Sequence, residues 1–332
     1  MSKINLAIEL GTSNTSVFLS GHGIVLFEPS VVAYSEKSVR AVGQRAKEML
    51  GRAPERTVVA RPVTEGVITD FEAAYIMLSQ FLRKVVTEKK FIQKIRMLLV
   101  VPCGLSAEEK AAFEELLRKN GATETVVVEK AVASAYGAGL PIAGAEGCFV
   151  VDIGGGTVDI AAISLLGIME GCTVCIGGEH IDQAVQQLML EKYGLQIGVL
   201  TAGKIKESIG SLFDNDISAM SVTGTDDSTK NPATVSIESK DIADAVLPYY
   251  GRIAEAVASV LNLCPPELSA QCLKSGIRLT GGGALITGAE HFFKSTLKVP
   301  FIIAPEPQYA CIAGAGKLLE DERTIREILS QN

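Results

Sequence analysis

Tryptophan is absent from this chain of 332 residues, histidine occurs three times, and aromatic residues make up only 5%. The histidines are far apart and show no ligand spacing, so a histidine metal centre is excluded and we interpret them as structural or surface residues. They are His22, His180 and His291. The hydrophobic residues, 47% of the chain, are mainly Val, Ile, Leu and Ala, which is typical of an ordinary α/β protein.

Long apolar runs and an excess of basic residues are also missing. No run approaches the roughly 20 residues of a membrane-spanning helix. Strand residues and Glu9 follow the first residues directly, so no signal peptide is predicted, and we expect a cytoplasmic protein. The formal net charge of −7 argues against nucleic acid as a partner, because general nucleic-acid binders usually carry a basic face.

Cysteine gives little support for a metal or redox site. The seven cysteines are scattered and odd in number, and only Cys172 and Cys175 have a ligand-like spacing. Without a second such pair, we interpret both as small hydrophobic residues in a strand. The length, in contrast, is informative, because 332 residues predict two domains of about 150 residues each.

The most informative segment comprises residues 148–164. An apolar run ends at Asp152, a glycine turn follows, and a second apolar run returns, which predicts a strand–turn–strand unit. Glycines have no Cβ, so such a turn can place bare backbone N–H groups against an anion. Asp152 lies where it can hold the magnesium ion that accompanies a phosphate. The turn consists of Gly154, Gly155 and Gly156.

The chain begins with the same kind of unit and carries a third glycine turn near its end. Residues 4–19 are again an apolar run, a carboxylate at Glu9, Gly11, and a returning apolar run. Residues 277–284 indicate a strand that runs into a glycine turn and opens a helix, a place for a nucleotide's phosphate or base. A duplicated phosphate hairpin predicts two lobes that close on one nucleotide.

These three motifs, in this order and spacing, resemble the actin superfamily of ATPases, which includes actin, the heat-shock chaperone ATPases and the sugar kinases. Four further stretches are similar to the MreB family of bacterial actins, and the similarity runs nearly end to end. They are residues 23–32, 41–52, 61–71 and 192–198. The resemblance implies an α/β actin-like ATPase fold with two lobes, each a ribonuclease H-like core with a small inserted subdomain.

The resemblance also implies domain boundaries. The first lobe core would comprise residues 1–32, 66–145 and 312–332, with residues 33–65 as its inserted subdomain. The second lobe core would comprise residues 146–180 and 240–311, with residues 181–239 inserted.

The same resemblance implies a site for ATP or ADP with Mg²⁺. Glu9 and Asp152 would face the magnesium, largely through its waters, and Asp159 would help to position the attacking water. Lys206 and Glu207 would close the pocket over the base and ribose, although a solvated helix face is the alternative for these two. The phosphates would lie against Gly11, Thr12, Ser13, Asn14, Gly154, Gly155, Gly156 and Thr157, and the adenosine above Gly281, Gly282 and Gly283.

Three positions depart from the family pattern. Glu9 stands where most relatives have aspartate, and Val158 replaces the second threonine of a pair. The family's Glu-Glu-Pro run, whose second glutamate orients the hydrolytic water, is here Glu129, Lys130 and Ala131. An ammonium cannot accept a proton from water, and Glu129 points about 100° away if the run is helical. We therefore expect ATP binding with slow hydrolysis.

The function implied is that of a filament-forming cytoskeletal protein in cell-shape determination, which assembles with itself. The alternatives are an actin-fold small-molecule kinase, for which no sugar-kinase signature is found, and a non-polymerising ATP-dependent regulatory protein. A dinucleotide oxidoreductase is disfavoured because strand-like residues follow Gly156 where a helix should begin. Phe91 and Ile92, flanked by lysines, are a candidate membrane contact, and wall-synthesis or cell-shape proteins are candidate partners.

Overall fold

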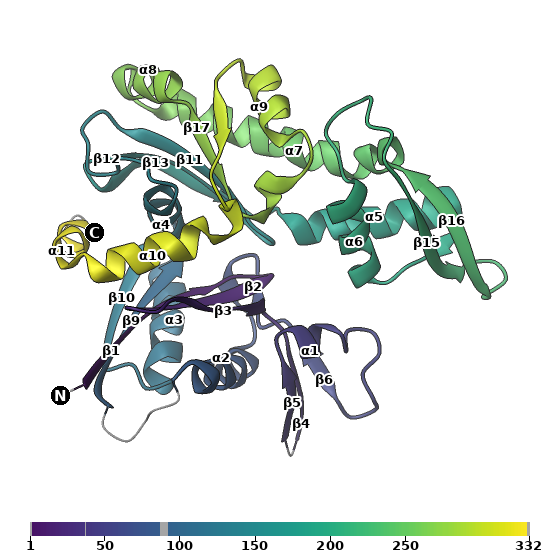
Figure 1. Ribbon diagram of the computed structural model, residues 1–332, viewed down its shortest axis with the longest axis horizontal. Coiled ribbons are helices and arrows are strands. Elements are labelled where there is room, and N and C mark those ends of the chain that lie inside the picture. The colour runs from purple at the N-terminus through teal and green to yellow at the C-terminus, as the bar shows by residue number, and fades with distance from the viewer. Residues whose placement is uncertain (1, 37, 87–91, 331–332) are drawn as a thin grey trace.

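The computed structural model describes residues 2–36, 38–86 and 92–330 and consists of two stacked lobes (Figure 1). The first lobe contains a five-stranded sheet of order β10-β9-β1-β2-β3. Strands β1, β2 and β3 form an antiparallel meander, whereas β9 and β10 run parallel to β1. Their bounds are β1 Ser2–Leu10, β2 Asn14–Leu19, β3 Gly23–Pro29, β9 Ile92–Val101 and β10 Glu124–Glu129.

The second lobe repeats this arrangement. Its sheet has the order β13-β12-β11-β17-β18, with an antiparallel meander and two strands parallel to β11. The predicted duplication and the actin-like α/β fold are therefore confirmed. The bounds are β11 Cys148–Ile153, β12 Val158–Ser164, β13 Gly167–Val174, β17 Ile277–Thr280 and β18 Phe301–Ile303.

Two helices, α4 (Lys130–Gly137) and α10 (Ala310–Glu320), lie between the sheets (Figure 1). They touch backbone to backbone, because a Cβ on Gly137 would lie 1.8 Å from the Ala310 carbonyl oxygen. A Cβ on Gly314 would likewise lie 1.8 Å from the Ala133 carbonyl oxygen. The small residues of α10 allow this close packing, which fixes the first residue of α4 beside both sheets.

Alternation along the strands decides which side chains face this inner layer. In β1, Leu6, Ile8 and Leu10 pack under the outer helices α2 (Phe71–Val85) and α3 (Ala107–Lys119). Ala7 instead packs with residues of α4 and α10, so Glu9 lies on that same inner face. In β11, Val150 faces inward and Val151 outward, which places Asp152 on the inner face too.

The helices begin and end largely where local signals predict. Asp70 accepts a hydrogen bond from the Ala73 N–H at 2.9 Å, and Ser106 with Glu109 forms a capping box at the start of α3. Ser239 is the first residue of α7 (Ser239–Leu263) and Glu238 is its cap, because the Glu238 backbone N–H is bonded by Asp241. Helix α6 comprises Val199–Ile209.

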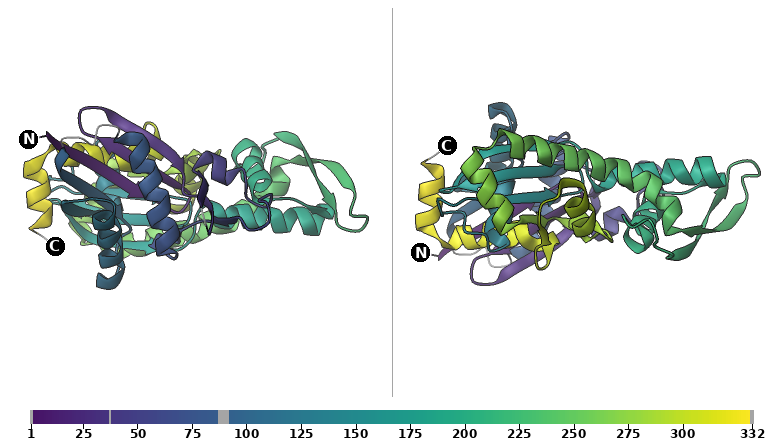
Figure 2. Two further views of the ribbon diagram at one scale, coloured as in Figure 1. Left: turned by 90° about the horizontal axis from the view of Figure 1, so that it is seen from below. Right: turned by 90° about the horizontal axis from the view of Figure 1, so that it is seen from above.

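Two three-stranded sheets extend from the lobes at the segments predicted as insertions. One contains β4 (Val32–Ser35), β5 (Ser38–Val42) and β6 (Val58–Ala60) beside α1 (Gln44–Lys47). The other contains β14 (Leu195–Gln196), β15 (Ala219–Asp226) and β16 (Pro232–Glu238) near α5 (Gly178–Tyr193). Figure 2 shows β15 and β16 at one end of an elongated molecule and both termini at the other.

The remaining elements are short and mostly peripheral. A two-stranded ribbon joins β7 (Val63–Thr64) and β8 (Val67–Ile68), and the 3-10 turns are η1 (Gly282–Leu285) and η2 (Pro307–Tyr309). The other helices are α8 (Pro266–Ser275), α9 (Ala289–Leu297) and α11 (Glu322–Leu329). Within the described ranges, no helix is long and apolar enough to cross a membrane.

Candidate functional site

A cavity of about 490 Å³ lies between the lobes, a volume within the range of small-molecule sites. Both glycine hairpins, the third glycine turn and α6 contribute to its walls. The structure therefore brings together nearly all residues predicted for the site. Those that line the cavity are Glu9, Gly11, Thr12, Ser13, Asn14, Lys130, Asp152, Gly154, Gly155, Gly156, Thr157, Lys206, Glu207, Gly281, Gly282 and Gly283.

The two hairpin turns touch each other across the cleft. A Cβ on Gly155 would lie 2.0 Å from the Ser13 Oγ, and one on Gly156 would lie 2.4 Å from the Thr12 Oγ1. Glycine is needed here because any side chain would separate the turns. Both turns thereby border the same volume, where glycine backbone without a Cβ can approach an anion closely.

The third glycine turn closes another side of the cavity. Gly281 has a φ of 79°, and a Cβ at this position would lie 2.4 Å from the Ile153 carbonyl oxygen. The Tyr250 hydroxyl donates to the Gly283 carbonyl oxygen at 2.6 Å and fixes the start of η1. Tyr250 also lines the cavity, but its helical spacing in the sequence marks it only as a core residue, so sequence reasoning missed it.

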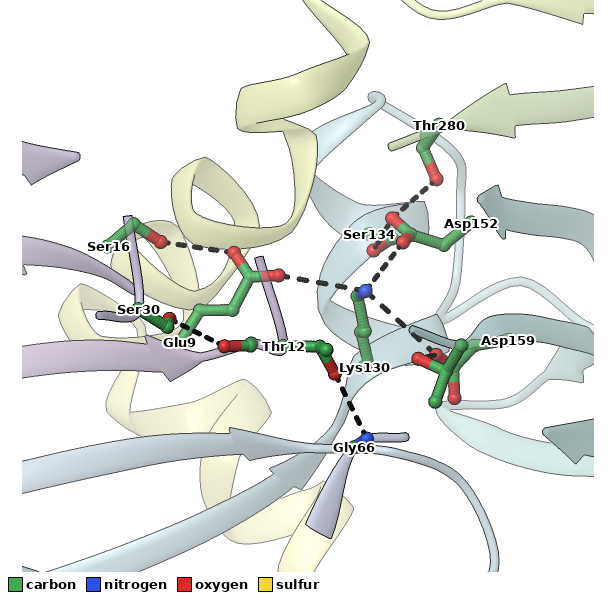
Figure 3. A network of polar contacts seen from close by, with 12 residues as sticks. Glu9, Thr12, Ser16, Ser30, Gly66, Lys130, Ser134, Asp152, Asp159 and Thr280 are labelled. Carbon is green, nitrogen blue, oxygen red and sulfur yellow. Dashed lines mark hydrogen bonds and ion pairs between the residues drawn. The ribbon is translucent and has the colours of Figure 1, made fainter. Parts of the chain in front are cut away.

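Lys130 extends from the start of α4 into the space between the two acidic strand ends (Figure 3). Its Nζ lies 2.8 Å from Asp152 Oδ1, 3.7 Å from Glu9 Oε1 and 4.0 Å from Asp159 Oδ2. The contact with Asp152 is an ion pair without the alignment of a hydrogen bond. The side chain that departs most from the family pattern thus lies at the centre of the site's charge.

The other oxygens of the two carboxylates are also bonded. Asp152 Oδ2 accepts from the Ser134 hydroxyl at 2.8 Å and the Thr280 hydroxyl at 2.9 Å, and Glu9 Oε2 accepts from Ser16 at 3.1 Å. Burial raises the pKa of Glu9, although Lys130 opposes the shift. Burial alone would lower the pKa of Lys130, but Asp152 and Glu9 outweigh it and raise that pKa well above its ordinary value.

Magnesium does not fit between Glu9 and Asp152 in this arrangement. A divalent ion there, or the waters it carries, needs carboxylate oxygens that face it, and the Lys130 ammonium already lies against them. In the part of the chain that the structure describes, no group of three or more acidic, histidine or cysteine side chains is placed to hold a metal. Cys172 and Cys175 are free thiols.

Two predicted catalytic residues do not line the cavity. Asp159 is 0% exposed, and its Oδ1 accepts from the Cys103 N–H at 3.0 Å and the Thr173 hydroxyl at 2.6 Å. Burial raises its pKa despite the opposing charge of Lys130. Glu129 is the N-cap residue of α4 and lines a separate hollow with Met169. Asp159 is thus bonded to its neighbouring segments and Glu129 lies at the N-terminal end of α4. Neither side chain faces the volume that the glycines enclose.

Lys206 and Glu207 lie on α6 at the cavity wall. Lys206 is not a solvated surface residue, because its Nζ donates to the Gly178 carbonyl oxygen at 2.8 Å and pairs with Asp182 Oδ1 at 2.7 Å. It therefore ties α6 to the start of α5. This contact favours the pocket-closing interpretation of Lys206 over the alternative of an open helix face.

Sequence reasoning also missed a contact that joins the lobes. The Glu179 carboxylate, at the start of α5 in the second lobe, accepts a hydrogen bond from the Ser13 hydroxyl at 2.9 Å. It also pairs with the guanidinium of Arg61 from the first-lobe side. The glycines immediately before Glu179 were the available signal, since they precede a helix as the third glycine turn precedes η1. The predicted membrane residue Phe91 lies outside the described residues, as does the side chain of Ile92.

Comparison with known proteins agrees with this geometry. The model of the MreB/Mbl protein family matches residues 3–327. The cell shape-determining protein MreB of Escherichia coli (strain K12) is 39% identical over 323 residues, which cover 95% of this chain and 93% of the relative. The cell shape-determining protein Mbl of Bacillus subtilis (strain 168) is 37% identical, with 96% of both chains covered.

Solved structures give the same result. The crystal structure of MreB5 of Spiroplasma citri bound to ADP superposes with a TM-score of 0.91 at 31% identity, covering 100% of this chain and 99% of that one. The MamK double helical filament matches with a TM-score of 0.82 at 24% identity over 96% of this chain and 99% of that chain, a likeness of fold alone. With a family match over almost its whole length and relatives above 35% identity, this chain belongs to the MreB/Mbl family.

Proposed function

We propose that this protein is an ATP-binding, filament-forming cytoskeletal protein of the MreB class that acts in cell-shape determination. The observation that carries the proposal is the meeting of two glycine hairpins, one from each duplicated sheet, over a cavity of about 490 Å³. Membership of the MreB/Mbl family supports the cellular role, because the relatives are named for cell-shape determination.

The ligand proposed for this cavity is ATP or ADP. The turns around Gly11 and Gly155 would supply backbone donors for the terminal phosphates, and the adenosine would lie against the turn at Gly281, which lines the same cavity. In support, the structurally similar MreB5 of Spiroplasma citri is described as bound to ADP in one crystal structure and to AMPPNP in another. Magnesium, expected from the sequence, is left out of the proposal because of the position of Lys130.

Hydrolysis is proposed to be slow. In the resemblance, the second glutamate before α4 orients the attacking water, and Lys130 occupies that position here. The nearest acidic alternative, Asp159, already accepts hydrogen bonds from Cys103 and Thr173 and does not face the cavity. A site without a free carboxylate at the phosphate lacks a general base, which commonly contributes about 10²- to 10⁴-fold to a rate.

The remaining sequence-based expectations belong to the same proposal. We infer a cytoplasmic protein that assembles with itself, and that contacts the membrane surface through Phe91 and Ile92. Cell-shape or wall-synthesis proteins are the proposed further partners. The proposed subdomains are residues 1–32 with 66–145 and 312–332, residues 33–65, residues 146–180 with 240–311, and residues 181–239. Only a polymer would give such a small apolar contact enough copies to hold at a membrane.

Two measurements test the proposal. Calorimetric titration with ATP and ADP is expected to show binding to the parent protein and none to Gly155→Val, whose Cβ would overlap Ser13. Electron microscopy with ATP, with ADP and without nucleotide is expected to show filaments that depend on nucleotide. Gly21→Val is the matched control, because a Cβ at that loop position meets nothing within 4 Å, although its φ of 76° costs some stability. Equal affinity of the parent and Gly155→Val would contradict the assigned site.

A further inference from the structure

Glu9 and Lys130, two of the three departures from the family pattern, lie next to each other in the structure. Glu9 extends from the end of β1 and Lys130 from the start of α4, and their charged atoms lie 3.7 Å apart. An aspartate at position 9 would end one methylene short of this contact. The longer side chain of Glu9 therefore reaches the ammonium of Lys130, and neither departure considered alone indicates this contact.

The ammonium joins both lobes at the level of the phosphate turns. Asp152 Oδ1, from the second lobe, lies 2.8 Å from the Lys130 Nζ, and the first-lobe carboxylate of Glu9 lies on the other side (Figure 3). The same Nζ lies 3.0 Å from the point that a Cβ on Gly154 would occupy. The Lys130 ammonium thus lies between the acidic residues at the strand ends and the glycine turn that begins at Gly154.

The side chains around this ammonium hold it in place. The Lys130 side chain is 12% exposed and that of Asp152 only 2%. Asp152 Oδ2 is fixed by the hydroxyls of Ser134 and Thr280, so its Oδ1 is left for the ammonium. Glu9 is oriented by Ser16 in the same way. These contacts fix the two carboxylates between which the ammonium lies.

We propose that the Lys130 ammonium takes the place of the nucleotide's divalent cation, so that this protein binds ADP and ATP without magnesium. The inference rests on the nucleotide binding proposed above. A fixed ammonium supplies one positive charge between the lobes, and the backbone N–H groups of the two turns supply the remaining contacts to phosphate. A cation that belongs to the chain also couples the lobes permanently, whereas a metal ion couples them only when it is bound.

The test is calorimetric titration of the parent protein with ADP, in excess magnesium and again in excess EDTA. We expect dissociation constants that differ by less than about threefold, far below the tenfold change that corresponds to 1.4 kcal/mol. Lys130→Glu, which restores the family's carboxylate, is expected to bind ADP at least about tenfold more weakly in EDTA than in magnesium. Lys130→Gln provides the same comparison with a neutral side chain if the glutamate variant does not fold.

The outcomes separate this inference from the proposed function. Binding of ADP by the parent in magnesium but not in EDTA would overturn the inference and leave the nucleotide site intact. No binding under either condition would overturn both. As a matched control, Lys274→Glu changes an exposed lysine of α8 and should retain the parent's indifference to magnesium. Loss of that indifference in the control as well would show that net charge, and not the position of Lys130, is responsible.

Discussion

Replacing Lys130 with methionine removes the charge between the two lobes while it keeps an unbranched side chain of similar length. Coulomb's law with an effective dielectric constant of about 20 gives an attraction of about 6 kcal/mol for a pair at 2.8 Å and about 4.5 kcal/mol at 3.7 Å. The contact with Asp152 is therefore the larger of the two. Desolvation of the ions offsets much of this attraction, so the net effect is smaller.

The expected loss follows from what the substitution leaves behind. Removing one partner of a buried ion pair typically costs about 3–5 kcal/mol, because the other charge stays buried without compensation. Asp152 is 2% exposed at its side chain but retains hydrogen bonds from Ser134 and Thr280. We therefore expect Lys130→Met to lower the free energy of unfolding by about 3 kcal/mol, at the lower end of that range.

The assay is urea unfolding followed by circular dichroism, in EDTA and without nucleotide, so that no other cation replaces the ammonium. Lys119→Met is the matched control, since Lys119 Nζ lies 3.0 Å from Glu115 Oε1 but the two side chains are 53% and 57% exposed. An exposed pair contributes at most about 1 kcal/mol. Equal losses in the two variants would refute the reasoning, because burial would then not distinguish the pairs.

Three further predictions concern hydrolysis, acid stability and membrane contact. In magnesium, Lys130→Glu should release phosphate from ATP at least about 10²-fold faster than the parent at steady state, and a parent rate equal to or above that of the variant would show that another residue activates the water. Hydrogen bonds, first that from Lys192, lower the pKa of Asp241 from 3.8 to about 2. The ionised carboxylate therefore makes its full contribution to the stability of the fold at pH values above 3.8, the pKa of the unfolded chain, and loses it as the pH falls through about 2. The melting temperature of Asp241→Asn should therefore change less between those pH values than that of the parent. Parallel plots of melting temperature against pH for the two proteins would contradict the assignment. A variant with Phe91→Ser and Ile92→Ser that still polymerises should float less with anionic liposomes, and flotation equal to the parent's would exclude this loop as the anchor.

The sequence by itself determined the duplicated fold and the position of the glycine turns. An apolar run that ends in a carboxylate, at Glu9 and again at Asp152, predicts a strand with an acidic side chain near its end, and the glycines that follow permit a tight turn. These signals are local, since they depend on the sterics of neighbouring residues. The cap at Asp70 and the capping box at Ser106 are local in the same way, because each joins residues three positions apart in the chain.

Only the tertiary structure decided what the charged side chains do. The sequence places Lys130 next to Glu129 at the start of a helix, but the carboxylates that attract its ammonium come from two strands in different sheets, β1 and β11. Asp159 was expected to face the attacking water, yet hydrogen bonds from Cys103 and Thr173 hold it in the interior. A long polar side chain turns toward whichever partners packing brings within reach, and one sequence does not specify that packing.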